Sequence, residues 1–260
     1  MTNSISKLEI RQFPCLSDNY GYLIHDPESG ETVAIDTPDA EAYLAAAKEA
    51  GWTITQIWNT HHHFDHAGGN AALKAATGAK ITAPMYDKHR ISPADIFVED
   101  GDTVKLGDVS ADVIFTPGHT MGHVVFHFPS EKIAFVGDTL FALGCGRLFE
   151  GSPAEMWTSL LRLRAWPDDT VIYCAHEYTQ ANAAFALSVD PANAALLAYA
   201  DEVAARRGQG LPTIPTILSK EKAANPFLRA DNAALARQVG LAGEDAVVVF
   251  AEVRARKDIF

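Results

Sequence analysis

Cysteine is scarce in this chain of 260 residues, which contains only Cys15, Cys145 and Cys174. An odd number at such wide spacing argues against a disulfide framework and favours a reducing compartment. Residues 1–7 contain no apolar run followed by a small-residue cleavage site, and no stretch approaches the ~20 apolar residues of a membrane span. We therefore expect a cytoplasmic protein that does not enter a membrane.

Positive charge is also limited, because 21 Lys and Arg residues face 33 Asp and Glu residues and give a net charge of −12. No run of Lys and Arg is longer than the pair Arg206-Arg207. Nucleic-acid binding needs a positive field toward the phosphates, so we expect no nucleic-acid partner. The chain also lacks the Gly-x-Ser-x-Gly segment of many serine hydrolases. We expect a monomer that acts on a small molecule, and an anionic substrate must find a local basic patch on this acidic protein.

Hydrophobic patterning divides the chain into a strand-rich part and a helical part. Helices are predicted from Thr37-Pro38, with threonine as the N-cap, to Gly51, over 69–77, and from Ser152-Pro153 to Ala165. From 178 onward the patterning is helical, which places a domain boundary near 175 and gives domains 1–175 and 176–260. The predicted strands cover residues 8–13, 20–24, 32–35, 53–59, 80–83, 103–106, 109–116, 123–128, 132–136 and 170–174. This order predicts two sheets packed face to face and covered outside by helices.

Four histidines and an aspartate are concentrated at 61–66, between a predicted strand and a predicted helix. Residues i and i+2 of an extended segment face the same way, which pairs His61 with His63. The following turn can bring Asp65 and His66 to a neighbouring point, so one segment can serve two metal ions. Imidazole with carboxylate suits zinc, iron or manganese, and the absence of a nearby cysteine argues against a closed structural zinc site. The alternative interpretation is a solvated histidine-rich loop.

Three further polar residues follow predicted strands. His119 lies on a glycine-rich turn, Asp138 comes directly after an apolar strand, and His176 follows a short buried strand. An unpaired carboxylate at the end of an apolar strand is costly to bury, and a bridging role between metal ions explains Asp138 economically. Ligands that converge from sequence-distant strand ends are typical of catalytic metal sites.

The segment His-x-His-x-Asp-His at 61–66 resembles the signature of the metallo-β-lactamase superfamily. Other segments resemble the glyoxalase II (hydroxyacylglutathione hydrolase) family. They are Thr116-Pro-Gly-His-Thr, Gly137-Asp-Thr-Leu-Phe, Gly144-Cys-Gly-Arg-Leu-Phe-Glu-Gly, His176-Glu-Tyr-Thr and the tail from Arg254 to Phe260. The resemblance spans nearly the whole chain. It implies an α/β fold, a four-layer αβ/βα metallo-β-lactamase sandwich in 1–175 that binds metal, followed by a helical substrate-binding domain in 176–260.

By this resemblance the site holds two divalent metal ions, with zinc expected first and iron or manganese left open. One ion is assigned to His61, His63 and His119, the other to Asp65, His66 and His176, and Asp138 bridges them. A hydroxide held between the metals beside Asp138 and Asp65 is then the nucleophile. The implied reaction is hydrolysis of S-D-lactoylglutathione to glutathione and D-lactate, the second step of methylglyoxal detoxification.

The resemblance also implies a set of substrate contacts. Arg254 and Lys257 lie three residues apart on the last predicted helix, so they share a face and can bind the glycine carboxylate of glutathione. Arg147 and Tyr178 match positions that contact the glutathione backbone, and Phe149 stands where some relatives have tyrosine. The last two cations also have a simpler interpretation, since a solvated helix C-terminus favours positive charge.

Other interpretations remain open at this point. A mononuclear iron dioxygenase acting on glutathione persulfide shares the fold and the 61–66 segment, and a non-catalytic metal-binding module belongs to a different class. A β-lactamase or a tRNA-processing nuclease would also fit the superfamily. Cys145 is a competing nucleophile, although its glycine neighbours indicate a turn residue. His62 is assigned to solvent or to contact with the ligands, and His123 to the start of a strand with a possible supporting role.

Overall fold

A computed structural model describes residues 7–260 of the chain. Residues 1–6 lie outside this part, and the expectation that the chain has no export signal rests mainly on them. Two compact units are present, the first comprising the chain up to Phe115 with 122–135 and the second comprising 116–121 with 136–260. The predicted division into 1–175 and 176–260 follows another criterion and stays a prediction. Between residues 7 and 260, no helix combines the length and hydropathy that crossing a membrane requires.

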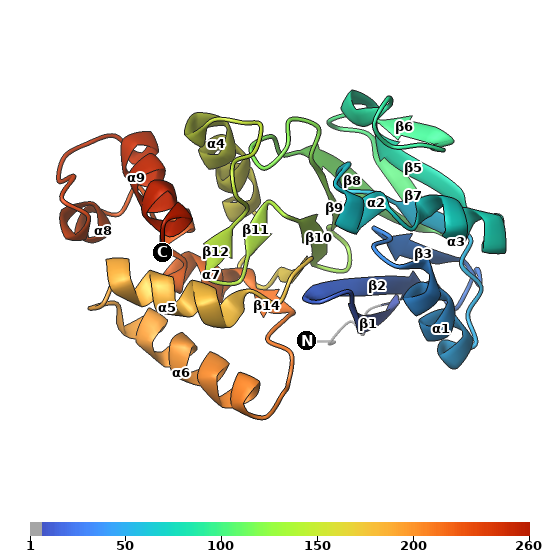
Figure 1. Cartoon of the computed structure of the whole chain (residues 1–260), viewed down its shortest axis with the longest axis horizontal. Coiled ribbons are helices and arrows are strands. Elements are labelled where there is room, and N and C mark those ends of the chain that lie inside the picture. Colours follow the sequence, from blue (N-terminus) through green and yellow to red (C-terminus); the bar gives the residue numbers. More distant parts are fainter. Residues whose placement is uncertain (1–6) are drawn as a thin grey trace. The chain divides into compact units, whose positions relative to one another are not determined.

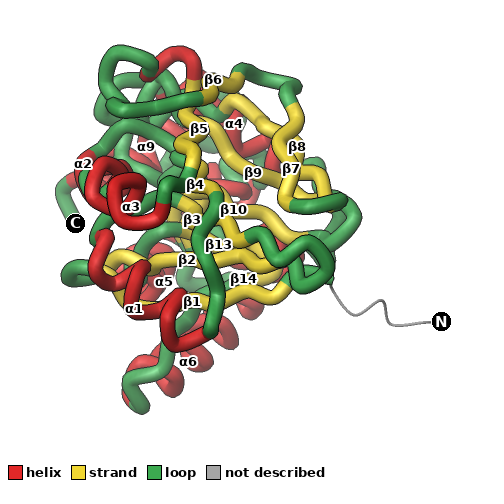
Figure 2. The backbone as a smooth tube through the Cα atoms, turned by 90° about the vertical axis from the view of Figure 1, so that its right-hand side faces the viewer, coloured by secondary structure: helices red, strands yellow, loops and turns green. Residues whose placement is uncertain are grey.

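The first unit contains a six-stranded sheet with strand order β1-β2-β3-β4-β5-β6 among the described residues. β1 to β3 are antiparallel neighbours, and β3 to β6 pair in parallel, with Ala34 opposite Ile57 and Ile57 opposite Ile81. α1 contacts β1 and β2, and α3 contacts β5 (Figure 2). The elements are β1 (Glu9–Cys15), β2 (Asn19–His25), β3 (Thr32–Ile35), α1 (Ala40–Ala50), β4 (Gln56–Trp58), α2 (Phe64–Ala67), α3 (Asn70–Thr77), β5 (Lys80–Pro84), η1 (Met85–Asp87) and β6 (Ile96–Val98).

The predicted start of α1 at Thr37-Pro38 is wrong. Asp39 is the N-cap, and its side chain accepts hydrogen bonds from the backbone N–H groups of Glu41 and Ala42. Thr37 is instead buried and donates its hydroxyl hydrogen to the side chain of Asn70. The predicted end is confirmed, because Gly51 adopts a left-handed conformation with φ 75° that suits glycine.

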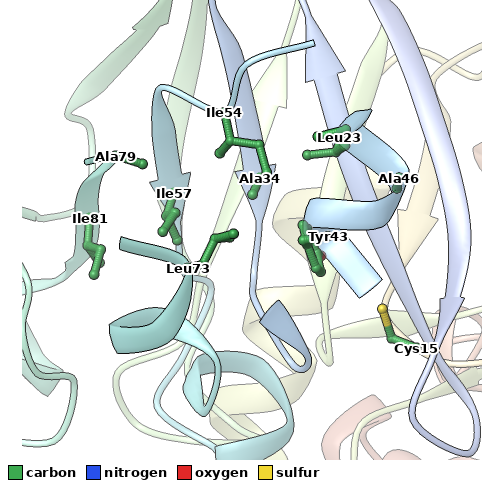
Figure 3. Packing of buried hydrophobic residues seen from close by; sticks show 11 residues of the cluster. Cys15, Leu23, Ala34, Tyr43, Ala46, Ile54, Ile57, Leu73, Ala79 and Ile81 are labelled. Carbon is green, nitrogen blue, oxygen red and sulfur yellow. The ribbon is translucent and has the colours of Figure 1, made fainter. Parts of the chain in front are cut away.

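Apolar side chains fill the space between the first sheet and its covering helices. Leu23, Ala34 and Ile57 project from the strands toward Tyr43 of α1 and Leu73 of α3 (Figure 3). All five are fully buried, and each large side chain contributes roughly 1.5–3 kcal/mol of transfer free energy. This packing fixes the edge of the sheet from which the loop after β4 departs.

A second set of strands belongs mainly to the first unit and has the order β10-β9-β8-β7. These strands are β7 (Thr103–Leu106), β8 (Val109–Phe115), β9 (Val124–Phe128) and β10 (Ile133–Gly137), all of them antiparallel neighbours. Aromatic rings connect this set to the first sheet, since Trp58 lies 5.3 Å from Phe126 and Tyr22 lies 5.4 Å from Phe135 between ring centroids. The predicted face-to-face packing of two sets of strands is therefore present in this unit.

The second unit is mostly helical, and Figure 1 shows α5 beside α6, which are in contact. The predicted cap of α4 is confirmed, because Ser152 and Glu155 form a reciprocal capping box with proline at the first position. The short strands β11, β12 and β14 were not predicted. The elements are β11 (Leu140–Phe141), β12 (Gly144–Cys145), α4 (Pro153–Arg164), β13 (Val171–Cys174), α5 (Thr179–Val189), α6 (Ala194–Gly208), β14 (Thr216–Ile217), α7 (Leu218–Ala224), η2 (Pro226–Leu228), α8 (Ala233–Gln238) and α9 (Ala246–Asp258).

A buried carboxylate holds the β11–β12 hairpin of the second unit in place. Glu221 of α7 has no exposed surface and accepts hydrogen bonds from the backbone N–H of Leu143 at 2.8 Å and from the amide of Asn225 at 3.0 Å. Its other oxygen accepts from the hydroxyls of Thr216 at 2.7 Å and Tyr199 at 3.1 Å. Burial raises the pKa of Glu221 above the ordinary 4.5.

Glu221→Ala is expected to lower the free energy of unfolding by about 3 kcal/mol, because the N–H of Leu143 and the amide of Asn225 each lose a buried acceptor. Glu221→Gln is expected to cost less than about 1 kcal/mol, since its amide can donate to the hydroxyls of Thr216 and Tyr199, which rotate. Urea unfolding measures both variants. Equal losses would show that the hydrogen bonds do not account for the effect.

The parent protein and the Glu221→Gln variant are expected to differ in how their free energy of unfolding depends on pH. A carboxyl group whose pKa is raised in the folded state contributes stability that is fully present below its unfolded pKa and is lost as pH rises through the folded pKa. The parent protein should therefore lose stability relative to Glu221→Gln as pH rises above about 4.5, the ordinary value.

Candidate metal centre and substrate site

In the first unit, His61 and His63 lie in the segment between β4 and α2, and Asp65 and His66 lie in the short helix α2 itself. β4 ends at Trp58 and α2 begins at Phe64, so the predicted strand-to-helix turn is confirmed. The ring centroid of His61 lies 4.7 Å from that of His63 and 4.1 Å from that of His66. The Nε2 atom of His66 lies 3.5 Å from Oδ2 of Asp65. Tertiary structure thus gathers in one place the side chains that the spacing pairs.

Asp36 orients two of these rings from the end of β3. It adopts a left-handed conformation with φ 54° and accepts the Nδ1–H of His66 at 2.9 Å. The hydroxyl of Thr60 donates its one hydrogen to the same carboxylate at 2.9 Å, so it accepts from Nδ1 of His61, which lies 3.0 Å away. Both histidines therefore carry their hydrogen on Nδ1 and direct the Nε2 lone pair toward the site.

The second unit contributes His119, Asp138 and His176. All three are buried, with at most 6% of their surface exposed. Nε2 of His119 lies 3.3 Å from one oxygen of Asp138, and Nε2 of His176 lies 3.4 Å from the other. The Nδ1–H of His119 donates to the carbonyl oxygen of Arg147 at 2.8 Å. The carboxylate of Asp138 thus faces one imidazole with each oxygen, which is the arrangement that a bridging ligand needs.

Glycine is required where the chain passes the backbone of Asp138 and the side chain of His119. A Cβ atom on Gly146 would lie 2.0 Å from the carbonyl oxygen of Asp138 and 3.1 Å from Cβ and Nδ1 of His119. A Cβ atom on Gly144 would lie 2.5 Å from the side chain of Asn182. The Gly-Cys-Gly segment therefore permits close packing behind the metal-ligand candidates.

The donor chemistry of both units fits divalent cations. A neutral imidazole that donates through Nδ1 presents a lone pair at Nε2, and a lone pair that faces a carboxylate oxygen at 3.3 Å is repulsive without a cation. His61, His63, Asp65 and His66 in the first unit, and His119, Asp138 and His176 in the second, all belong to groups of side chains able to hold a metal ion. Imidazole and carboxylate donors are those of zinc, iron and manganese sites.

Two family models match consecutive parts of the chain. The metallo-β-lactamase superfamily covers residues 22–176, and the hydroxyacylglutathione hydrolase C-terminus covers residues 177–260. The hydroxyacylglutathione hydrolase of Maricaulis maris is 65% identical over 98% of this chain and 100% of its own length, and that of Erythrobacter litoralis is 58% identical over 97% and 100%. The chain belongs to the hydroxyacylglutathione hydrolase family.

Solved structures place the hydroxyacylglutathione hydrolase family within a wider fold. ETHE1 from Myxococcus xanthus superposes with a TM-score of 0.68 at 26% identity and covers 95% of this chain and 90% of its own. TTHA1623 in a di-iron-bound form superposes with a TM-score of 0.61 at 25% identity, covering 85% and 100%. The predicted α/β metallo-β-lactamase fold with a helical C-terminal domain is confirmed, and the metallo-β-lactamase fold with its histidine and aspartate clusters implies divalent metal ions.

Two histidines that the sequence left without a firm role support the ligand segment. His62 lies 3.4 Å from a carboxylate oxygen of Asp87, which is fully buried and ion-paired with Arg90. His123 is buried and stacks on His61 with ring centroids 4.8 Å apart. Asn19 donates its amide to the carbonyl of Asp65 at 3.1 Å. These contacts hold the backbone and the rings of the segment. The sequence suggested such a supporting role for His62 and His123, but not for Asp87 or Asn19.

The residues predicted to contact glutathione all lie in the second unit. Tyr178 stacks on the ring of His176 at 4.7 Å, and Phe149 lies edge-on to His119 at 5.3 Å, so both aromatic rings adjoin metal-ligand candidates. Arg147 is more than half exposed, whereas Arg254 on α9 is buried. Lys257 follows on α9 and is the more accessible of the two helix cations.

Cys145 is a buried thiol that faces Arg254. Burial raises its pKa to about 11, although the guanidinium of Arg254 lowers the pKa in part. The raised pKa disfavours the reactive thiolate near neutral pH. Its backbone carbonyl accepts a hydrogen bond from Nη1 of Arg254 at 3.1 Å. Burial and this hydrogen bond favour a structural role in the turn over a role as nucleophile.

Proposed function

We propose that this protein hydrolyses S-D-lactoylglutathione and related 2-hydroxyacyl thioesters of glutathione. The observation that carries the proposal is the 65% identity to a hydroxyacylglutathione hydrolase over 98% of the chain, which includes both the metal-binding and the helical part. Water is consumed, the C–S bond of the thioester breaks, and a carboxylic acid and a thiol are released.

The proposal extends to the metal ligands. His61, His63 and His119 would hold one zinc ion, Asp65, His66 and His176 the other, and Asp138 both. When bound, two such cations lower the pKa of a water molecule toward neutrality and polarise the thioester carbonyl. Asp36, Thr60 and the carbonyl of Arg147 keep the imidazoles in the tautomer that binds metal. The negative charge of Asp138 would offset the positive charge of the bound cations, because its two oxygens face His119 and His176.

The remaining parts of the proposal concern substrate capture and location. Arg254 and Lys257 would bind the glycine carboxylate, with Arg147 and Tyr178 beside the glutathione backbone. The rings of Phe149 and Tyr178 would flank the thioester, since both adjoin metal-ligand candidates. We also propose a monomer in the cytoplasm, because all three cysteines of the chain are free and buried, as expected for a reducing compartment.

One assay tests this function. Purified protein is expected to consume S-D-lactoylglutathione and release free thiol, to lose this activity on chelation, and to regain it when zinc is restored. Glutathione persulfide with an oxygen electrode is the matched measurement for the dioxygenase alternative. Oxygen uptake without thiol release from the thioester would overturn the proposal, and activity that survives complete metal removal would overturn the metal-dependent mechanism.

A further inference from the structure

Asp258, the last residue of α9, forms ion pairs with two arginines of the candidate substrate site. Its Oδ1 atom lies 3.0 Å from Nη2 of Arg254 and 3.4 Å from Nε of Arg147. A carboxylate in the last turn of a helix is disfavoured by the helix dipole, which places partial negative charge there. Its partners therefore come from side-chain cations and not from the helix.

Arg254 has its two terminal nitrogens occupied within the protein. Nη1 donates to the carbonyl oxygen of Cys145 at 3.1 Å, and Nη2 donates to Asp258. The guanidinium also lies over the ring of Phe227, 5.1 Å from its centroid. Nε is buried and makes no hydrogen bond among the described residues. An incoming carboxylate would compete with Asp258 for Nη2, because Nη1 already donates to the carbonyl of Cys145 and Phe227 covers one face of the guanidinium.

Lys257 differs from Arg254 in having no acidic partner. Within residues 7–260 its ammonium group contacts the carbonyl oxygen of Ala181 at 3.3 Å and the rings of Phe185 and Phe260, and it forms no ion pair. Partial burial and the neighbouring guanidinium of Arg254 lower the pKa of Lys257. Arg254 and Lys257 are thus adjacent cations of which only Arg254 pairs with a carboxylate, that of Asp258, and their mutual repulsion favours a second anion.

We propose that Asp258 is an internal substitute for the substrate carboxylate, which displaces it from Arg254 when glutathione binds. This inference rests on the proposed function and specifies how that site selects its substrate. Arg147 is already within ion-pair distance of Asp258 and is more exposed than Arg254, so it retains the displaced carboxylate. Binding exchanges one carboxylate for another on Arg254, and Asp258 therefore weakens capture of the glycine carboxylate by competing for the same cation.

Asp258→Asn tests the competition directly. The variant is expected to lower KM for S-D-lactoylglutathione about fivefold, which corresponds to about 1 kcal/mol, and to lower the inhibition constant of free glutathione by a similar factor. Glu252→Gln is the matched control, because Glu252 pairs with Arg256 on the same helix and contacts neither Arg254 nor Arg147. It removes the same charge and is expected to leave both constants within twofold of the parent values.

A second substrate separates competition from a structural effect. The lactoyl thioester of γ-glutamylcysteine lacks the glycine carboxylate, so Asp258→Asn should leave its KM unchanged. Asp258→Ala repeats the test with a side chain that cannot hydrogen-bond to Arg254. A higher KM in both variants would show that Asp258 positions Arg254. An unchanged KM would show that Asp258 does not compete with the substrate. Either result would overturn the inference. Failure of the parent protein to hydrolyse the thioester would instead refute the proposed function.

Discussion

Asp138→Ala is expected to abolish thioester hydrolysis and to reduce the metal content of the purified protein. The carboxylate of Asp138 faces Nε2 of His119 with one oxygen and Nε2 of His176 with the other. Without it, two cations would face each other with no shared anion between them. Loss of a residue that only supports a metal ligand costs roughly 10–100-fold in affinity or activity, so loss of the bridge should cost at least about a hundredfold. Elemental analysis and steady-state kinetics on the same samples provide the measurement.

Asp108→Ala is the matched control for this experiment. Asp108 is an exposed aspartate in the turn between β7 and β8. The variant therefore makes the same chemical change, loss of one aspartate side chain, at the protein surface. It should retain parental metal content and rate. If Asp138→Ala kept both metal ions and near-parental activity, the assignment of Asp138 as the bridge would be wrong. Circular dichroism distinguishes a local loss of metal from a loss of fold.

The second large effect is expected from replacing both Arg254 and Lys257 with alanine. Charge-assisted hydrogen bonds contribute about 1.5–3 kcal/mol each, and 1.4 kcal/mol corresponds to about a tenfold change in binding. KM for a glutathione thioester should therefore rise at least about tenfold, while the metal content is retained. A small thioester without glutathione carboxylates should be a poor substrate of the parent and almost unaffected by the double change.

Burial of Arg254 makes a stability control essential for this double variant. Its guanidinium donates to the carbonyl of Cys145 and lies over Phe227, so its removal also disturbs the packing of α9. Arg256→Ala provides the matched comparison, because Arg256 lies on the same helix and donates to the carbonyl of Val239. Equal losses on both substrates would indicate that α9 supports the fold, and unchanged kinetics would return both cations to a surface role.

The sequence predicted the ligand segment well because the relevant information is local. Alternation places His61 and His63 on one side of an extended segment, and Asp65 and His66 follow within three residues of His63, in α2. The positions of His119, Asp138 and His176 could likewise be recognised, because each is a polar residue that follows a predicted apolar strand. The assignment of all seven residues as metal ligands stays a proposal.

The residues that orient the ligands could not be predicted in the same way. Asp36 lies 30 positions from His66, and the segment Asp36-Thr37-Pro38 reads as a helix start. Only the packing of β3 beside β4 brings that carboxylate to Thr60 and His66. The same interpretation misassigned the N-cap of α1, because Thr37 is used inside the protein and Asp39 takes its place.

Burial of Arg254 was partly visible in the pattern of the last helix. Residues four apart share a helix face, and Phe250 precedes Arg254 by four positions. Both are buried, so Arg254 belongs to the apolar face that carries Phe250 and Val253. Strands of two residues such as β11, β12 and β14 carry too few positions for any periodicity to be read. β11 and β12 also depend on hydrogen bonds to Glu221 and Asn225, which are distant from them in the sequence.

Arg147 joins parts of the enzyme that an engineer would wish to alter separately. Its carbonyl oxygen fixes the ring of His119, while its guanidinium faces Asp258 at the end of α9. Transplanting the helical tail alone, as a redesign for another thiol carrier, would pair foreign side chains with Arg147, whose backbone carbonyl is bonded to the metal-ligand candidate His119. The exchangeable module for altered carrier preference is therefore α9 together with residues 144–149, and a library that varies one without the other will sample mostly mismatched combinations.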